Sequence, residues 1–128
     1  MTAIDPNLNP MLITPKIEEA EILTVQLELS NKKARIINGY GPQESYCQQN
    51  RFNFWSGLEQ EVISAKSESC MLIIQMDANA KVGRNIISRD PNNVTDSNGR
   101  QLLDMIERHG LVMLNANKNC NGSITRYS

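Results

Sequence analysis

The sequence predicts an α/β protein with a mixed sheet flanked by helices, and three observations support this. Residues 23–29 alternate between apolar and polar side chains, which is typical of a half-buried strand. Residues 46–66 have apolar side chains mostly three or four positions apart, which indicates an amphipathic helix. Two short apolar runs end in polar clusters at Tyr40 and Asp77, as buried strands do at the rim of a sheet. Strands and helices in this order are typical of α/β proteins.

The first half of the chain divides into an arm, a hairpin and a helix. Residues 1–20 are expected to form an arm or loop, because Pro, Asp and Asn are frequent among the first ten. A turn at residues 31–33 predicts an antiparallel hairpin between the strand 23–29 and the strand ending at Tyr40. The helix is expected to turn a stripe of apolar residues toward the sheet, with Trp55 as its anchor: Phe52, Trp55, Leu58, Val62 and Ile63.

The second half continues with a strand, a helix and a last strand. Residues 71–76 form the next expected strand, and residues 81–94 form a long polar connection. A second helix is expected to open at residues 97–100, with an inward stripe of Leu102, Leu103, Met105 and Ile106, and to end at Gly110. His109 in its last turn complements the helix dipole. Residues 111–114 are expected to form the last strand.

Composition limits the possible function classes. The chain of 128 residues fits one domain, and its 13 basic and 14 acidic residues leave a formal charge of −1, so no basic patch indicates a nucleic-acid partner. Cys47, Cys70 and Cys120 lack zinc-site spacing and are expected to be reduced thiols. Because no secretory signal or membrane-length apolar run is present, we expect a soluble, intracellular protein, nuclear or cytoplasmic, with no membrane contact.

The strongest candidate site residues are Asp77 and Asn79, which follow the apolar run 71–76. A carboxylate that orients water beside an amide that donates to a phosphate oxygen could serve hydrolysis. The same Asp-x-Asn pattern is also typical of a turn, because both side chains bond to nearby backbone. From these residues alone both interpretations stay open.

Several short motifs in order resemble the endonuclease/exonuclease/phosphatase superfamily, most closely the apurinic-endonuclease-like domain of non-LTR retrotransposons. They are INGYGPQ at residues 37–43, IIQMDANAKVG at 73–83, SNGRQLL at 97–103, HGLVMLN at 109–115 and SITR at 123–126. The resemblance implies a partial four-layer α/β sandwich of the DNase I-like kind over residues 21–128. A doubly wound sheet is the alternative from element order alone, although no phosphate-binding glycine loop is present.

The resemblance also implies the roles of individual residues. Asp77 matches the acid that activates water, Asn79 and Tyr40 match groups that face the scissile phosphate, and Asn38 and Thr125 match substrate-binding positions. It implies Mg²⁺, with Mn²⁺ as a substitute, and DNA as the substrate, although the metal ligands themselves are not identified.

Departures from the family pattern point to a weak or inactive site. Met76 stands where relatives have Gly and is expected to narrow the cleft, and Ala78 replaces a frequent aromatic. The upstream metal-binding Glu and the final Ser-Asp-His of relatives have no match here. We therefore expect either a fragment of a longer product, such as a reverse-transcriptase polyprotein, or self-association through an exposed sheet face.

Two functions from different classes follow. One is a Mg²⁺-dependent DNA endonuclease, weak or inactive in this chain. The other is a non-catalytic interaction module or decayed fragment that keeps the central half of the fold, in which Asp77 and Asn79 only form a turn.

Overall fold

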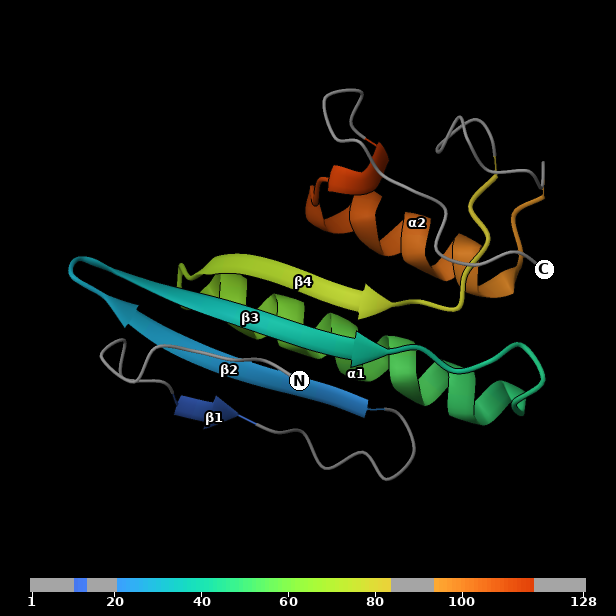
Figure 1. The fold of residues 1–128 in the computed structure, drawn as a ribbon, viewed down its shortest axis with the longest axis horizontal. Helices are drawn as coiled ribbons and strands as arrows, with labels where there is room; N and C mark the ends of the chain where they lie inside the picture. Colours follow the sequence, from blue (N-terminus) through green and yellow to red (C-terminus); the bar gives the residue numbers. More distant parts are fainter. Residues whose placement is uncertain (1–10, 14–20, 84–93, 117–128) are drawn as a thin grey trace. The chain divides into compact units, whose positions relative to one another are not determined.

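The computed structural model describes residues 11–13, 21–83 and 94–116 (Figure 1). The chain divides into two compact units, Met1–Asn79 and Ala80–Ser128, and each is treated by itself below.

The first unit is a mixed four-stranded sheet with one long helix. Its elements are β1 (Met11–Ile13), β2 (Glu21–Leu29), β3 (Lys32–Tyr40), α1 (Gln48–Ser67) and β4 (Met71–Asp77). The strands lie in the order β1-β2-β3-β4, with β1, β2 and β3 antiparallel and β4 parallel to β3. The predicted α/β class and mixed sheet are confirmed.

The hairpin of β2 and β3 also agrees with the sequence pattern. Leu29 is the partner of Lys32, so the two residues Ser30 and Asn31 make the turn. At the other end Glu21 is the partner of Tyr40. Strand β1 lies within the segment that was expected to be an arm or loop, and pairs with β2.

Helix α1 runs along one face of the sheet (Figure 1) and buries a stripe of large side chains. The buried residues are Phe54, Trp55, Leu58, Val62 and Ala65. The rings of Phe54 and Trp55 meet edge to face with their centroids 5.1 Å apart, a favourable aromatic geometry. Trp55 is buried, as expected for the residue predicted to anchor the helix on the sheet.

Two members of the predicted stripe were wrong. Phe52 is 60% exposed and Ile63 is 44% exposed. A helix turns by about 100° per residue, so a residue two positions before Phe54 lies on nearly the opposite side. The stripe is set by Phe54, Leu58 and Val62, four residues apart, and Phe52 lies outside it.

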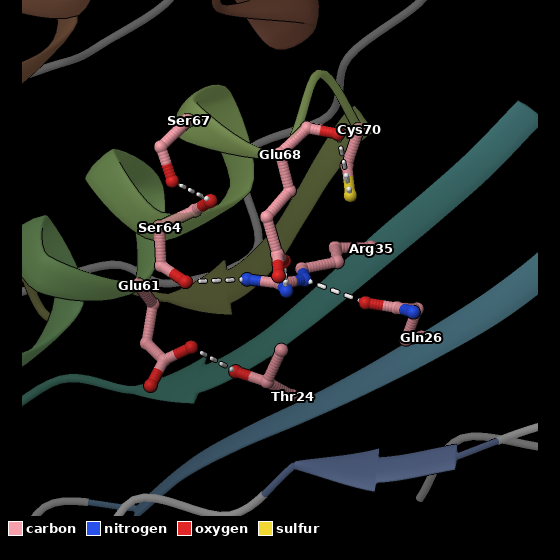
Figure 2. Close-up of polar contacts among 8 residues, drawn as sticks. All are labelled: Thr24, Gln26, Arg35, Glu61, Ser64, Ser67, Glu68 and Cys70. Atoms are coloured by element: carbon pink, nitrogen blue, oxygen red, sulfur yellow. Dashed lines mark hydrogen bonds and ion pairs between the residues drawn. The ribbon is translucent and has the colours of Figure 1, made fainter.

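Beneath the C-terminal half of α1 lies a buried polar layer beside the buried apolar residues Val62 and Ala65 (Figure 2). Arg35 Nε donates to Gln26 Oε1 at 3.0 Å, and its Nη1 donates to Ser64 Oγ at 2.7 Å. Arg35 also forms an ion pair with Glu68. Thr24 Oγ1 donates to Glu61 Oε2 at 3.2 Å. Because these partners satisfy the polar atoms, the layer can be buried without a large desolvation penalty.

This layer corrects the expectation of a strand with its polar face toward solvent. The alternating pattern of β2 is real, but Thr24 and Gln26 are buried under α1. The apolar residues of β2 and β3 make a second cluster, in which Val25, Leu27 and Ala34 are buried and Leu23 and Ile36 pack against them. The middle of β2 is thus buried on both faces, because Thr24 and Gln26 on the helix side have hydrogen-bond partners.

The second unit is built around helix α2 (Ser97–His109). The residue before it, Asp96, caps the helix: its Oδ1 accepts from the backbone of Gly99 at 2.7 Å and of Lys81 at 3.0 Å. A bridge between Val82 and Thr95 joins the same two segments. The helix therefore begins one residue after a cap that the sequence did not single out.

We expect Asp96→Ala to lower the free energy of unfolding of the second unit by about 1–2 kcal/mol, because it removes the helix cap. The lost bond to the Lys81 amide adds to this cost. Asp104→Ala is the matched control, because Asp104 is an exposed residue of the same helix. Amide exchange across residues 97–109 would measure both variants, and equal effects would contradict the capping role of Asp96.

The C-terminal end of α2 follows the sequence prediction, but the segment after it does not. Gly110 has φ 62°, and the Leu111 amide donates to the Ile106 carbonyl at 2.9 Å, so Gly110 ends the helix as expected. Met105 is buried and Ile106 partly buried, in agreement with the predicted stripe. The strand expected at residues 111–114 was wrong, since a short 3₁₀ helix, Leu114–Ala116, begins there. A strand needs a neighbour for its backbone bonds, and the described residues pair none with this segment.

Candidate functional site

The candidate site lies where β3 and β4 end side by side. Because the two strands are parallel, their last residues are register partners, and Tyr40 is the partner of Asp77. Asp77 is exposed, and Tyr40 is 45% exposed. Side chains of register partners point to the same face of a sheet. The sequence-predicted pair of Tyr40 and Asp77 is therefore brought together and is open to solvent.

The same face of the sheet carries Asn38 and lies opposite α1. Arg35 bonds to α1, so Asn38 and Tyr40, at odd spacing from it, point away from the helix. Asn38 is partly buried and is the partner of Gln75 on β4. Farther along this face, Met71 and Ile73 of β4 are 50% and 41% exposed. On this face, polar side chains therefore gather at the ends of the two strands, and exposed apolar side chains lie toward the start of β4.

Asn79 is placed differently from the other candidates. Strand β4 ends at Asp77, so the alternation of a strand does not continue to Asn79, whose φ is 44°. Its backbone N–H donates to Asp77 Oδ1 at 3.1 Å, which is the turn that the Asp-x-Asn pattern favours. Its side-chain Nδ2 donates across to the Gly41 carbonyl oxygen at 2.7 Å.

Gly41 completes a set of contacts between the two strand ends, which we call the strand-end clamp and which consists of Gly41, Asp77 and Asn79. The Gly41 amide donates to the Asp77 carbonyl oxygen at 2.6 Å, while the Gly41 carbonyl accepts from Asn79. A Cβ at position 41 would lie 2.7 Å from the carbonyl carbon of Ala78 and closer still to its oxygen. Only glycine fits this close approach of two backbones.

Sequence reasoning missed Gly41 as a residue of the site. It lies in the motif that carried the family resemblance, between Tyr40 and Pro42, but its letter alone does not reveal which segment it meets. A glycine directly after a buried strand is the signal for close backbone approach.

Met76 does not narrow the site, contrary to the expectation from the sequence. A Cβ built at Gly39 would lie 3.3 Å from Met76 Cβ and 3.6 Å from Phe54 Cζ, so these groups share the face covered by α1. Met76 therefore points to the opposite face from Asp77.

The groups at the strand ends could hold Mg²⁺ only through a single carboxylate, with water molecules as the other ligands. Mg²⁺ binds through one or two carboxylates while it keeps several waters. Asp77 supplies one exposed carboxylate. Across the described residues, no cluster of three or more His, Cys, Asp or Glu could hold a metal ion. Glu21 of β2 is the register partner of Tyr40 on the other side of β3, so its backbone lies one strand farther from Asp77 than that of Tyr40 does.

The remaining sequence candidates lie elsewhere. Thr125 and Cys120 fall outside the described residues. Cys47 and Cys70 are free thiols, as expected. His109 lies in the last turn of α2 in the second unit, where the sequence placed it.

Comparison of the chain with protein-family models, with curated proteins and with solved structures gives no match. In the described parts of the chain, no helix combines the length and the apolar character needed to cross a membrane.

Proposed function

We propose that the ends of β3 and β4 form the phosphate-facing part of a Mg²⁺-dependent phosphodiesterase site acting on DNA. The fold proposed for it is the DNase I-like four-layer sandwich of the endonuclease/exonuclease/phosphatase superfamily, and the nearest type is the retrotransposon endonuclease. The single observation that supports this is the adjacency of Tyr40 and Asp77 on one exposed edge of parallel strands. The family resemblance implies that Tyr40 faces the scissile phosphate and that Asp77 activates the water that attacks it.

Each residue of the pair has a chemical role in this proposal. The Asp77 carboxylate orients a water molecule and takes its proton as the water oxygen bonds to phosphorus. The bond from phosphorus to the leaving sugar oxygen breaks, and that oxygen takes a proton from solvent. The Tyr40 hydroxyl donates a hydrogen bond to a phosphate oxygen, on which negative charge builds up during attack. Mg²⁺ held by the carboxylate would offset that charge.

We expect hydrolysis by these residues alone to be slow. The described strand ends bring one exposed carboxylate to the site. The first unit contains no histidine that could donate a hydrogen bond to the phosphate or a proton to the leaving oxygen. Removing one preorganised donor from an active site typically lowers the rate by about 10²–10³-fold.

The proposal predicts that Asp77→Asn weakens Mg²⁺-dependent binding of a short abasic-site duplex by about tenfold or more, because it removes the charge that faces the ion. Isothermal titration with Mg²⁺ and with Mn²⁺ would measure the affinity for the duplex. The substitution keeps an oxygen that can accept from the Asn79 amide, so the turn is preserved.

Asp104→Asn makes the same change of charge on the exposed surface of α2 and serves as the control. Equal affinities for Asp77→Asn and the unchanged chain, or no binding by a folded chain, would refute the proposal. Cleavage of the duplex that Asp77→Asn abolishes would extend it from binding to catalysis.

A second candidate, a non-catalytic interaction module, is favoured by the strand-end clamp. Asp77 and Asn79 both bond to backbone within the clamp, as turn-forming residues do. This alternative predicts indifference to metal and a loss of stability on replacing either residue. The same titration separates the two candidates. A reverse-transcriptase polyprotein as the parent or partner of this chain is also a proposal, and rests on the family resemblance alone.

A further inference from the structure

We infer that Gly41 and Asn79 are positioning residues: they fix the Tyr40 and Asp77 side chains relative to each other, and Asn79 acts on the site through the clamp rather than as a phosphate ligand. The identity of what Tyr40 and Asp77 bind rests on the proposed function. The positioning role itself rests on the contacts of the clamp, and is tested without any ligand.

The first argument is the conformation of Asn79. A non-glycine residue at φ 44° carries a conformational cost, which Asn tolerates better than most residues because its short side chain can bond locally. Here that side chain bonds to a residue 38 positions earlier, on the neighbouring strand end. With this positive φ the chain leaves the extended conformation of β4, and the side-chain amide of Asn79 reaches the Gly41 carbonyl.

The second argument is the use of both backbone polar atoms of Gly41. Its N–H bonds to the Asp77 carbonyl and its carbonyl bonds to the Asn79 amide, so residue 41 is held from two sides. Tyr40 precedes Gly41 directly, and Asp77 provides one of the two contacts. The Gly41 N–H and the Tyr40 carbonyl belong to one planar peptide unit, so holding the Gly41 N–H against Asp77 also holds the backbone at the end of Tyr40.

The third argument is that the clamp has little room to adjust. A side chain at position 41 would collide with the backbone at Ala78, which cannot rotate away as a flexible side chain can. The 2.6 Å backbone bond from Gly41 to Asp77 and the 2.7 Å bond from the Asn79 side chain to Gly41 reinforce this contact on either side. The contacts of the clamp thus fix the two chains relative to each other after the last pair of the β-ladder, Tyr40 and Asp77.

The test uses Asn79→Gly, which permits the positive φ but removes the amide. We expect hydrogen exchange at the Gly41 amide to accelerate by about tenfold, because its neighbouring contact is lost. NMR signals of the Tyr40 ring and the Asp77 carboxyl carbon should shift, while exchange of the Ile37 amide should stay unchanged. Met71→Ala, a change at an exposed residue at the other end of β4, is the control and should leave the Gly41 amide and the Tyr40 signals as they are.

Asn79→Asp provides a second variant of nearly the same shape, in which a donor becomes an acceptor facing the Gly41 carbonyl. It should give the same acceleration at Gly41, and it decides the matter if Asn79→Gly does not fold. Unchanged Gly41 exchange, or uniform acceleration of all amides in the first unit, would overturn the inference. Loss of duplex binding in Asn79→Gly with unchanged Gly41 and Tyr40 signals would instead make Asn79 a direct ligand. A chain that binds no duplex but shows the Gly41 effect refutes the proposed function and leaves the positioning role intact.

Discussion

Phe54→Ala should lower the free energy of unfolding of the first unit by about 3–5 kcal/mol, the cost typical of removing a buried aromatic ring. Phe54 is fully buried, and it is the largest of the fully buried side chains. Its ring meets Trp55 edge to face and lies over Gly39 of β3. The substitution removes transfer energy and an aromatic contact together, and leaves a cavity between α1 and the sheet. Urea unfolding followed by Trp55 fluorescence would measure the loss.

Phe52→Ala provides the matched control, because it removes the same ring from the same helix two residues away. Phe52 is 60% exposed, so we expect a change within about 0.5 kcal/mol, as for most surface substitutions. Equal losses for the two variants would mean that the stripe of α1 is assigned incorrectly. The pair therefore tests the correction that the structure makes to the helix stripe predicted from the sequence.

The strands of the first unit could be predicted because their signals are local. Alternation marks β2, and both β3 and β4 stop where polar residues follow an apolar run, at Tyr40 and Asp77. The spacing of apolar residues predicted the helix, and its only tryptophan, Trp55, lies on the buried side. Phe52 was misassigned because Phe52 and Trp55 are three residues apart, and spacing alone cannot tell which of two overlapping stripes the sheet will cover.

The polar layer under α1 could not be predicted from the sequence, because it depends on partners far apart in the chain. Thr24 looks like a solvent-facing residue until the packing of α1 brings Glu61 to it. Gln26 is paired with Arg35 across the hairpin, and the packing of α1 adds Ser64 as a further partner of Arg35. Residues 111–114 failed as a strand for a related reason: a strand requires a neighbour, and no local pattern shows whether one exists.

The sequence singled out Tyr40, Asp77 and Asn79 as candidate site residues, but not Gly41 or the contacts that these residues make. The parallel pairing of β3 and β4, joined through α1, brings Tyr40 and Asp77 together, which the family resemblance implied. The contact between Asn79 and Gly41 joins residues 38 positions apart, so neither the clamp nor the need for glycine at position 41 could be read from local sequence. Of the two interpretations left open for Asp-x-Asn, the turn is present, and the proposed chemistry concerns the exposed carboxylate beside Tyr40.

Arg35→Ala should have the second large effect, about 2–4 kcal/mol lost from the free energy of unfolding. Arg35 is 4% exposed and connects Gln26 of β2 to Ser64 of α1. Its removal leaves the buried Gln26 and the half-buried Ser64 without this partner, and an empty volume between the sheet and the helix. Chemical denaturation of the purified chain would measure the loss.

Glu68→Ala removes the other half of the ion pair, but the Glu68 side chain is 49% exposed. Solvent screens such a pair, so we expect a loss of less than about 1 kcal/mol. The asymmetry follows because Arg35 without Glu68 keeps its bonds to Gln26 and Ser64, whereas those two groups without Arg35 lose a donor inside the fold. Arg35→Met separates packing from charge, since it fills much of the volume and supplies no donor. A loss for Glu68→Ala as large as for Arg35→Ala would show that the ion pair, rather than the buried hydrogen bonds, holds α1 on the sheet.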